Sequence, residues 1–256
     1  YGKLGNDANV GAFQFYNYIR PISANPIVII GGQQQKGYMT DVVPNPNLTW
    51  EVSTNYNIGL DATLWHGLLG IEFDTFYKIT KHILSAQTGN FPSSVGNYFP
   101  SIINYGIVDN KGFELALTNN SKFGNVNFSA RANINWARNK IIRIDDEANI
   151  PAYQLSVGRE IGEKEGFVAL GLFQSQDEIN NSALVGSNTL PGDIKYKDLN
   201  GDGKIDYDHD RKWIGRSDIP EMMFGLNLSA TWKNLDFSTL LQGATLCDDA
   251  LMGNYP

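Results

Sequence analysis

The segment from Val52 to Leu64 alternates between polar and apolar side chains along almost its whole length. Its even positions carry Val, Thr, Tyr, Ile, Leu, Ala and Leu, whereas its odd positions carry Ser, Asn, Asn, Gly, Asp and Thr. Successive side chains of a β-strand point to opposite faces, so this pattern predicts a long strand with one apolar face. The pattern returns in 126–136 and 224–232. A sheet of such strands needs an apolar medium on one side, which is either a second sheet or lipid.

Each of these strands has a neighbour across a short turn. The predicted hairpins join 52–64 to 68–78, 112–118 to 126–136, and 222–232 to 235–243. A weaker alternation favours another strand in 13–20. The connections 79–110 and 138–221 are much longer, and the second is too long for an ordinary link inside a compact domain. It contains an apolar run at 167–173 and a polar stretch at 174–181 that predicts a short helix.

Short and long connections alternate along the chain, so all short turns lie at one rim of the sheet and all long loops at the other. Outer-membrane β-barrels have this asymmetry. The strand 126–136 would span about 25 Å of membrane height at the usual tilt. Trp65 and Trp232 precede short turns and predict one aromatic belt, while Trp136 and Tyr77 predict the other. The alternative is a soluble β-sandwich, but the predicted strands are long for one. Their polar faces are also dense in charged and amide residues, namely Asn57, Asp61, Glu72, Asp74, Arg131, Asn133 and Asn135.

Composition excludes several classes of function. The net charge of −7 is unfavourable for binding nucleic acid. The single cysteine, Cys247, excludes an internal disulfide and any site with several cysteine ligands. His66, His82 and His209 have no spacing typical of a nucleophilic or zinc site, and no phosphate-binding glycine loop is present. We therefore expect no enzymatic activity.

Several stretches resemble the C-terminal half of the SusC/RagA-type TonB-dependent transporters of the Bacteroidetes outer membrane. Together they extend over nearly the whole chain, in the order and spacing of that family. They are NPNLTWE (45–51), GLDATLWHGLLGIEFDTFYKIT (59–80), NKGFEL (110–115), GLFQSQDEI (171–179) and PGDIKYKDLNGDGKID (191–206).

The resemblance implies an all-β fold, an antiparallel transmembrane β-barrel segment with long extracellular loops, taken from a barrel of roughly 22 strands. The chain starts at Tyr1 without a signal sequence. We therefore expect 1–256 to be a partial C-terminal barrel region, with the plug domain, the TonB box and the final strand outside this chain. The implied function is import of a glycan or peptide nutrient across the outer membrane, with a SusD-type lipoprotein as partner and TonB acting through the N-terminal region.

The segment 198–210, DLNGDGKIDYDHD, resembles a calcium-binding loop. Asp198, Asn200 and Asp202 occupy its positions 1, 3 and 5, and glycine occupies position 6, where the chain turns sharply. Position 12 is His209, although a hard cation prefers a carboxylate there, and Asp208 or Asp210 could supply it instead. The candidate ligands of a structural Ca²⁺ are Asp198, Asn200, Asp202, Lys204 through its carbonyl, Asp206 and Asp210. The alternative is an acidic turn held by side-chain to backbone hydrogen bonds, without a metal.

Two other functions remain open from the residues alone. One is a secreted, calcium-stabilised, carbohydrate-binding sandwich, and the other is a barrel used for adhesion or protein export. Aromatic residues in the predicted loops are candidates for contact with substrate or lipoprotein, and packing within the loops themselves is the alternative. They are Tyr16, Tyr18, Phe91, Tyr98, Phe99 and Tyr105.

Overall fold

The computed structural model describes residues 1–8, 19–21, 27–36, 38–40, 45–86, 102–147 and 149–249. Strands dominate these residues, and the α-helix among them is a single short one. None of the helices found there is long and apolar enough to cross a membrane. Predictions that concern Tyr16, Tyr18, Phe91, Tyr98 and Phe99 lie outside the described residues.

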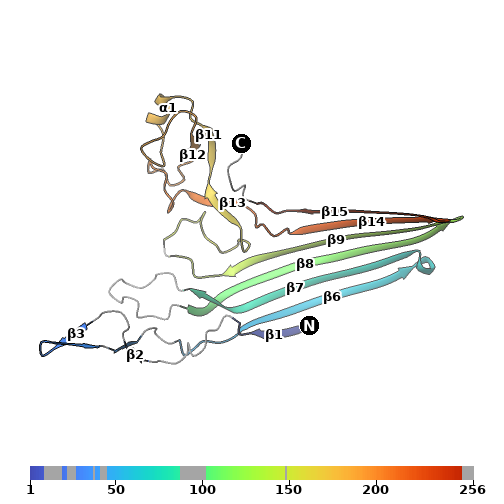
Figure 1. Cartoon of the computed structure of the whole chain (residues 1–256), viewed down its shortest axis with the longest axis horizontal. Coiled ribbons are helices and arrows are strands. Elements are labelled where there is room, and N and C mark those ends of the chain that lie inside the picture. The colour runs from blue at the N-terminus through green and yellow to red at the C-terminus, as the bar shows by residue number, and fades with distance from the viewer. Residues whose placement is uncertain are drawn as a thin grey trace. The chain divides into compact units, whose positions relative to one another are not determined.

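Seven strands form one open antiparallel sheet in the order β1-β6-β7-β8-β9-β14-β15 (Figure 1). They follow one another along the sheet in chain order. Their bounds are β1 Gly2–Asn6, β6 Glu51–Leu64, β7 Leu69–Ala86, β8 Ile102–Phe123, β9 Val126–Arg143, β14 Met222–Trp232 and β15 Leu235–Thr245. The sheet confirms the predicted hairpins, and its long, consecutively paired strands agree with the predicted segment of an antiparallel barrel.

The remaining elements are small. Two-stranded sheets pair β2 with β5, β3 with β4, β10 with β13 and β11 with β12. Their bounds are β2 Ile19–Pro21, β3 Ile27–Ile30, β4 Gln33–Lys36, β5 Tyr38–Thr40, β10 Lys164–Phe167, β11 Ala169–Leu172, β12 Ile194–Tyr196 and β13 Arg211–Gly215. Two helices complete the described set, the 3₁₀ helix η1 Trp65–Gly67 between β6 and β7 and the α-helix α1 Gln176–Asn180.

Three strands continue beyond their predicted ends. β7 extends to Ala86 instead of 78, β8 begins at Ile102 instead of 112, and β9 extends to Arg143 instead of 136. The backbone ladder persists there although the apolar alternation fades, because ladder hydrogen bonds depend on the main chain and not on the side chains. The long connection before β14 therefore begins at residue 144, and the predicted boundary at 138 was wrong.

The Cα positions divide the chain into two units. The first comprises Tyr1–Asn55, Lys78–Asp109 and Ile142–Ala148, and the second comprises Tyr56–Tyr77, Asn110–Ile141 and Asn149–Pro256. In the first unit β1 adds to the edge of β6, with Gly2 opposite Asn55 and Asn6 opposite Glu51. The Asn104 amide ties the same unit together, since it donates to the carbonyls of Thr49 at 2.7 Å and His82 at 2.8 Å.

The buried apolar residues of the described chain all lie in the long connection between β9 and β14. They are Phe173, Ile179 and Ile205. The predicted apolar run 167–173 supplies the end of β10 and all of β11, and Phe167 packs against Tyr196 and Tyr207 with ring centroids 5.2 Å apart in each pair. The connection from 144 to 221 is therefore a small folded element with its own core.

Candidate functional site

The register between β9 and β14 separates polar from apolar side chains. One face pairs Trp136 with Met222, Ile134 with Phe224, Ala132 with Leu226, Ala130 with Leu228, Phe128 with Ala230 and Val126 with Trp232. The other face pairs Asn135 with Met223, Asn133 with Gly225, Arg131 with Asn227, Ser129 with Ser229 and Asn127 with Thr231. The predicted alternation is thus carried in register across neighbouring strands.

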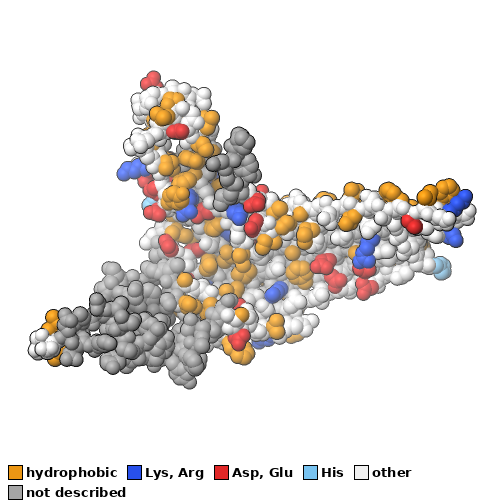
Figure 2. All heavy atoms as spheres, in the orientation of Figure 1, with side chains coloured by type: hydrophobic (Ala, Val, Ile, Leu, Met, Phe, Trp, Pro, Cys, Tyr) orange, Lys and Arg blue, Asp and Glu red, His pale blue; other side chains and the backbone are white. Residues whose placement is uncertain are grey.

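The apolar face is not covered by other described parts of the chain. Ile58 is 73% exposed and Leu60 is 60% exposed in β6. Figure 2 shows further hydrophobic side chains at the surface over the strands. In a β-sandwich the apolar faces of two sheets would pack on each other, whereas here the buried hydrophobic residues among those described lie outside the large sheet. The exposure of this face contradicts the sandwich alternative.

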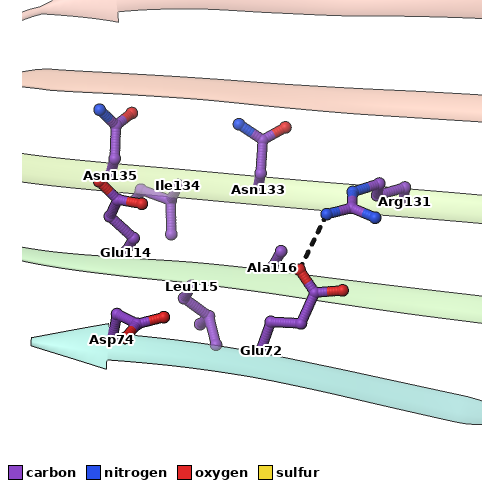
Figure 3. Close-up of a pocket in the computed structure, with 9 residues that line it drawn as sticks. All are labelled: Glu72, Asp74, Glu114, Leu115, Ala116, Arg131, Asn133, Ile134 and Asn135. Carbon is purple, nitrogen blue, oxygen red and sulfur yellow. Dashed lines mark hydrogen bonds and ion pairs between the residues drawn. The ribbon is translucent and has the colours of Figure 1, made fainter. Parts of the chain in front are cut away.

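The polar face carries a hollow of about 400 Å³ in the second unit. Side chains of β7, β8 and β9 line it and point to the same side of the sheet (Figure 3). They are Glu72, Asp74, Glu114, Arg131, Asn133 and Asn135, and the strands' own Leu115, Ala116 and Ile134 complete the lining. The sequence places most of these on the polar face. Glu114 was not predicted, although its position between Phe113 and Leu115 in an alternating segment was sufficient to assign it.

The hollow is negative. The Arg131 guanidinium bonds to Glu72 with a nitrogen–oxygen distance of 3.0 Å, and both side chains are about half exposed. This pair leaves Asp74 and Glu114 as two further carboxylates in the lining. The Asp74 carboxylate lies over Gly59 of β6, where any side-chain carbon on residue 59 would come within 2.5 Å of Asp74 Oδ1. Because residue 59 is glycine, the Asp74 side chain has room on the polar face. Its carboxylate can contact a solute there.

The helix α1 confirms the short helix predicted in 174–181. Ser175 caps it by accepting from the Glu178 N–H at 3.2 Å. The Glu178 carboxylate accepts from the Gln174 N–H at 2.9 Å and from the Lys195 ammonium at 2.8 Å. The backbone hydrogen bond, followed by that from Lys195, lowers the pKa of Glu178.

This lowered pKa predicts a loosening of α1 in acid. A group whose folded pKa is depressed stabilises the fold above its unfolded pKa and loses that effect as the pH falls through the folded value. We expect the amides of 174–182 to exchange hydrogen faster, relative to β9 amides, once the pH is well below the ordinary Glu pKa. Glu178→Gln should show fast exchange at every pH. Equal pH dependence in both proteins would contradict the assignment.

The acidic loop is closed by its own hydrogen bonds. Asp198 accepts from the Gly201 N–H at 2.6 Å and the Gly203 N–H at 2.9 Å. The Asn200 side chain donates to Asp202 at 3.0 Å, and Asp202 also accepts from the Lys204 N–H at 2.9 Å. These two hydrogen bonds, that of Asn200 first, lower the pKa of Asp202. The carboxylates therefore accept hydrogen bonds from the loop itself, as the alternative of an acidic turn without a metal predicts.

Asp206 and Asp210 close the second half of the loop. Asp206 accepts from the N–H groups of Asp208 at 3.0 Å and His209 at 2.8 Å. Asp210 is fully buried and accepts from the Leu199 N–H at 2.7 Å and the Asp206 N–H at 2.9 Å. Within the described ranges no group of three or more His, Cys, Asp or Glu side chains is placed to hold a metal ion. The six predicted calcium ligands thus lie in one loop, and calcium binding there stays a prediction.

Tyr153 lies against this loop. Its hydroxyl donates to the His209 carbonyl. Burial, followed by the charges of Asp210, Asp198 and Asp206, raises the pKa of Tyr153. The loop is therefore also contacted by a residue far away in sequence, which the loop motif alone did not reveal.

Of the predicted loop aromatics, Tyr105 is described. It belongs to β8, where the Arg143 side chain donates to its carbonyl at 2.8 Å and lies 4.6 Å from its ring centroid. This contact occupies one face of the ring. The structure therefore supports packing within the protein for Tyr105, which was one of the predicted alternatives.

A sheet of long antiparallel strands, with one uncovered apolar face and one hollowed polar face, defines the wall of a membrane β-barrel. The family model for the TonB dependent receptor-like β-barrel matches residues 11–246, and the chain belongs to that family. The predicted fold class and the outer-membrane localisation are confirmed.

Several relatives share this similarity. TonB-dependent receptor P26 of Formosa agariphila is 32% identical over 254 residues, which are 95% of this chain and 24% of that protein. TonB-dependent receptor SusC of Bacteroides thetaiotaomicron is 26% identical over 78% of this chain and 20% of its own length. Among solved structures, the RagAB peptide importer in its open-open state has a TM-score of 0.65 at 20% identity, over 96% of this chain and 25% of that one. The chain therefore spans about a quarter of the length of the relatives it matches. The likeness to the RagAB importer shows the fold alone.

Proposed function

We propose that this chain is part of the wall of an outer-membrane transporter that imports a glycan or a peptide. The observation that carries the proposal is the hollowed polar face, with Glu72, Asp74 and Arg131 directed to the side opposite the lipid-facing residues. A water-filled lumen gives charged and amide side chains a solvent, whereas the bilayer does not. The family membership and the relatives named TonB-dependent receptor and SusC support energised uptake.

Two partners belong to this proposal. TonB would act on the full-length protein through its N-terminal region. A SusD-type lipoprotein would bind at the rim that carries the long connections, to which the folded element 144–221 belongs. The name of one relative, SusC, and the likeness in fold to the RagAB peptide importer support this arrangement. The family consists of receptors and transporters, and we propose no chemistry on the substrate.

Uptake by intact cells tests the proposal. The gene for the full-length protein is deleted and restored, and the uptake of labelled oligosaccharides and labelled peptides is measured with and without TonB. We expect uptake of one of these classes to require both the gene and TonB. Arg131→Ala on the polar face should change that uptake, whereas Ile58→Val on the apolar face should not. An adhesion or export barrel would leave the uptake of both classes unchanged after deletion.

The acidic loop remains a candidate for structural calcium. Ca²⁺ prefers carboxylate and carbonyl oxygens, and Asp198, Asp202 and Asp206 supply such oxygens within a single turn. We expect chelation to increase cleavage of 198–210 by a protease in the full-length protein, and added Ca²⁺ to reverse the effect. Asp202→Ala should abolish the response, whereas Asp177→Ala, an exposed aspartate outside this loop, should keep it. Identical cleavage with and without chelator would favour the metal-free alternative.

A further inference from the structure

The apolar face of β9 ends in a basic group. Trp136 is the last residue of its apolar run, and Arg138 and Lys140 follow at the same two-residue period, so they belong to the same face. Both are exposed. In β8, Phe113 packs beside Trp136 with ring centroids 6.1 Å apart, and the exposed Lys111 precedes Phe113 by two residues. Because β8 and β9 are antiparallel, Lys111 and Arg138 lie on the same side of this aromatic pair.

A buried carboxylate organises the group. Glu221 is 6% exposed and lies immediately before β14. Its Oε2 accepts from the Trp136 indole N–H at 3.2 Å. Its Oε1 lies 3.4 Å from Arg138 Nε and 3.6 Å from Arg216 Nη1. One carboxylate thus contacts the Trp136 indole and two guanidinium groups at once.

The charges in this group do not balance. Two guanidinium groups share one carboxylate oxygen, and that oxygen has no hydrogen bond of good geometry among the described residues. The arginine side chains are 54% and 44% exposed, so their remaining N–H donors are open to the surroundings. Asp248, the other carboxylate bonded near Arg216, accepts from its backbone N–H at 2.7 Å. With the exposed Lys111 and Lys140 the group has four basic side chains against the carboxylates of Glu221 and Asp248, so it presents excess positive charge.

The position of this basic group relative to the membrane indicates which kind of ligand it binds. Tryptophan and tyrosine mark the level at which a bilayer changes from acyl chains to head groups. Trp136 ends the lipid-facing run at the rim with the long connections, which is the extracellular rim in outer-membrane barrels. Side chains directly beyond it on the same face meet the head groups of the outer leaflet. Basic residues at that level attract anionic head groups, and the planar guanidinium group suits phosphate.

We propose that Lys111, Arg138, Lys140 and Arg216 bind the phosphate of an outer-leaflet lipid, with Glu221 as the positioning residue for the two arginines. The occupant is a phosphorylated glycolipid anchored in the membrane that covers the apolar face. This inference shares the membrane-facing wall with the proposed function but does not rest on transport, so failure of the uptake test would leave the lipid site standing.

Lipid retention by the full-length protein tests the proposal. The protein is placed in phosphatidylcholine nanodiscs with increasing amounts of monophosphoryl lipid A, and bound lipid A is counted by native mass spectrometry. Each basic residue near an anionic surface contributes about fivefold to affinity. We expect Arg138→Gln/Arg216→Gln to weaken lipid A binding about 25-fold. The matched control Arg131→Gln removes an arginine from the polar face of the same strand and should bind as the natural protein does.

The proposal would be overturned by unchanged binding in the double variant or by an equal loss in Arg131→Gln. Equal retention of dephosphorylated lipid A by the natural protein would also overturn it, because the phosphate is the recognised group. Barrel folding is checked by the heat-dependent shift of the protein on a gel. If the double variant fails to fold, Lys140→Gln replaces it, with an expected loss of about fivefold.

Discussion

Leu60→Lys should destabilise the barrel by about 2 to 4 kcal/mol, because a charge near the bilayer midplane on the lipid face costs that amount. Leu60 belongs to the apolar face of β6 and is 60% exposed, so no described part of the protein covers it. It lies five residues before Trp65, which marks one rim, and that distance corresponds to about half the height of the membrane. The new ammonium group would therefore meet acyl chains and not water.

The matched control is Asn57→Lys in the same strand. Asn57 is exposed on the opposite, polar face, where a water-filled lumen would solvate the charge, so we expect almost no loss of stability. Both variants are made in the full-length protein and unfolded by urea in lipid vesicles. Equal stability changes in the two variants would contradict the assignment of the faces. A larger loss in Asn57→Lys would invert it.

The alternation of side chains was sufficient to predict the strands that cross the membrane. The strands predicted at 52–64 and 222–232 match β6 and β14 to within one residue. One face of these strands must stay apolar, so every second residue is restricted to a largely apolar set of side chains. The outer ends of β7, β8 and β9 carry no such constraint, because they lie beyond the acyl chains of the bilayer. Their extent depends on backbone pairing, which leaves little trace in side-chain type.

The residues of the candidate site likewise include some that alternation predicted and some that it did not. Glu72, Asp74 and Arg131 were assigned to the polar face because alternation fixes the face of each residue. Glu221 escaped prediction because its partners, Trp136, Arg138 and Arg216, come from the end of β9 and from the long connection. Likewise, the loop motif marked Asp210 as a possible ligand, whereas its burial and its two backbone donors follow only from the folded loop. The role of Glu221 depends on contacts with a segment far away in the sequence, whereas that of Asp210 depends on how its own loop folds.

Gly112→Ala should disrupt the pairing of β8 with β9 and cost at least about 3 kcal/mol, at the upper end of overpacking effects. A side-chain carbon at this position would collide with the Trp136 carbonyl oxygen and would lie 2.8 Å from two ring carbons of Phe76. The ring could rotate, but the carbonyl belongs to the backbone of β9. Gly112 is also held in place by its own carbonyl, which accepts from the Thr75 hydroxyl at 3.0 Å.

Two further variants of the full-length protein, unfolded by urea in lipid vesicles, show whether the Phe76 ring or the Trp136 carbonyl requires glycine at 112. Gly70→Ala is the matched control, because a side-chain carbon there meets Thr118 at an ordinary 3.6 Å. It should leave stability nearly unchanged. Phe76→Leu/Gly112→Ala removes the ring but not the carbonyl, so we expect it to recover little of the loss. Full recovery would show that the ring alone requires glycine at 112. A stable Gly112→Ala single variant would show that β9 can move away from β8, contrary to the tight spacing of the wall.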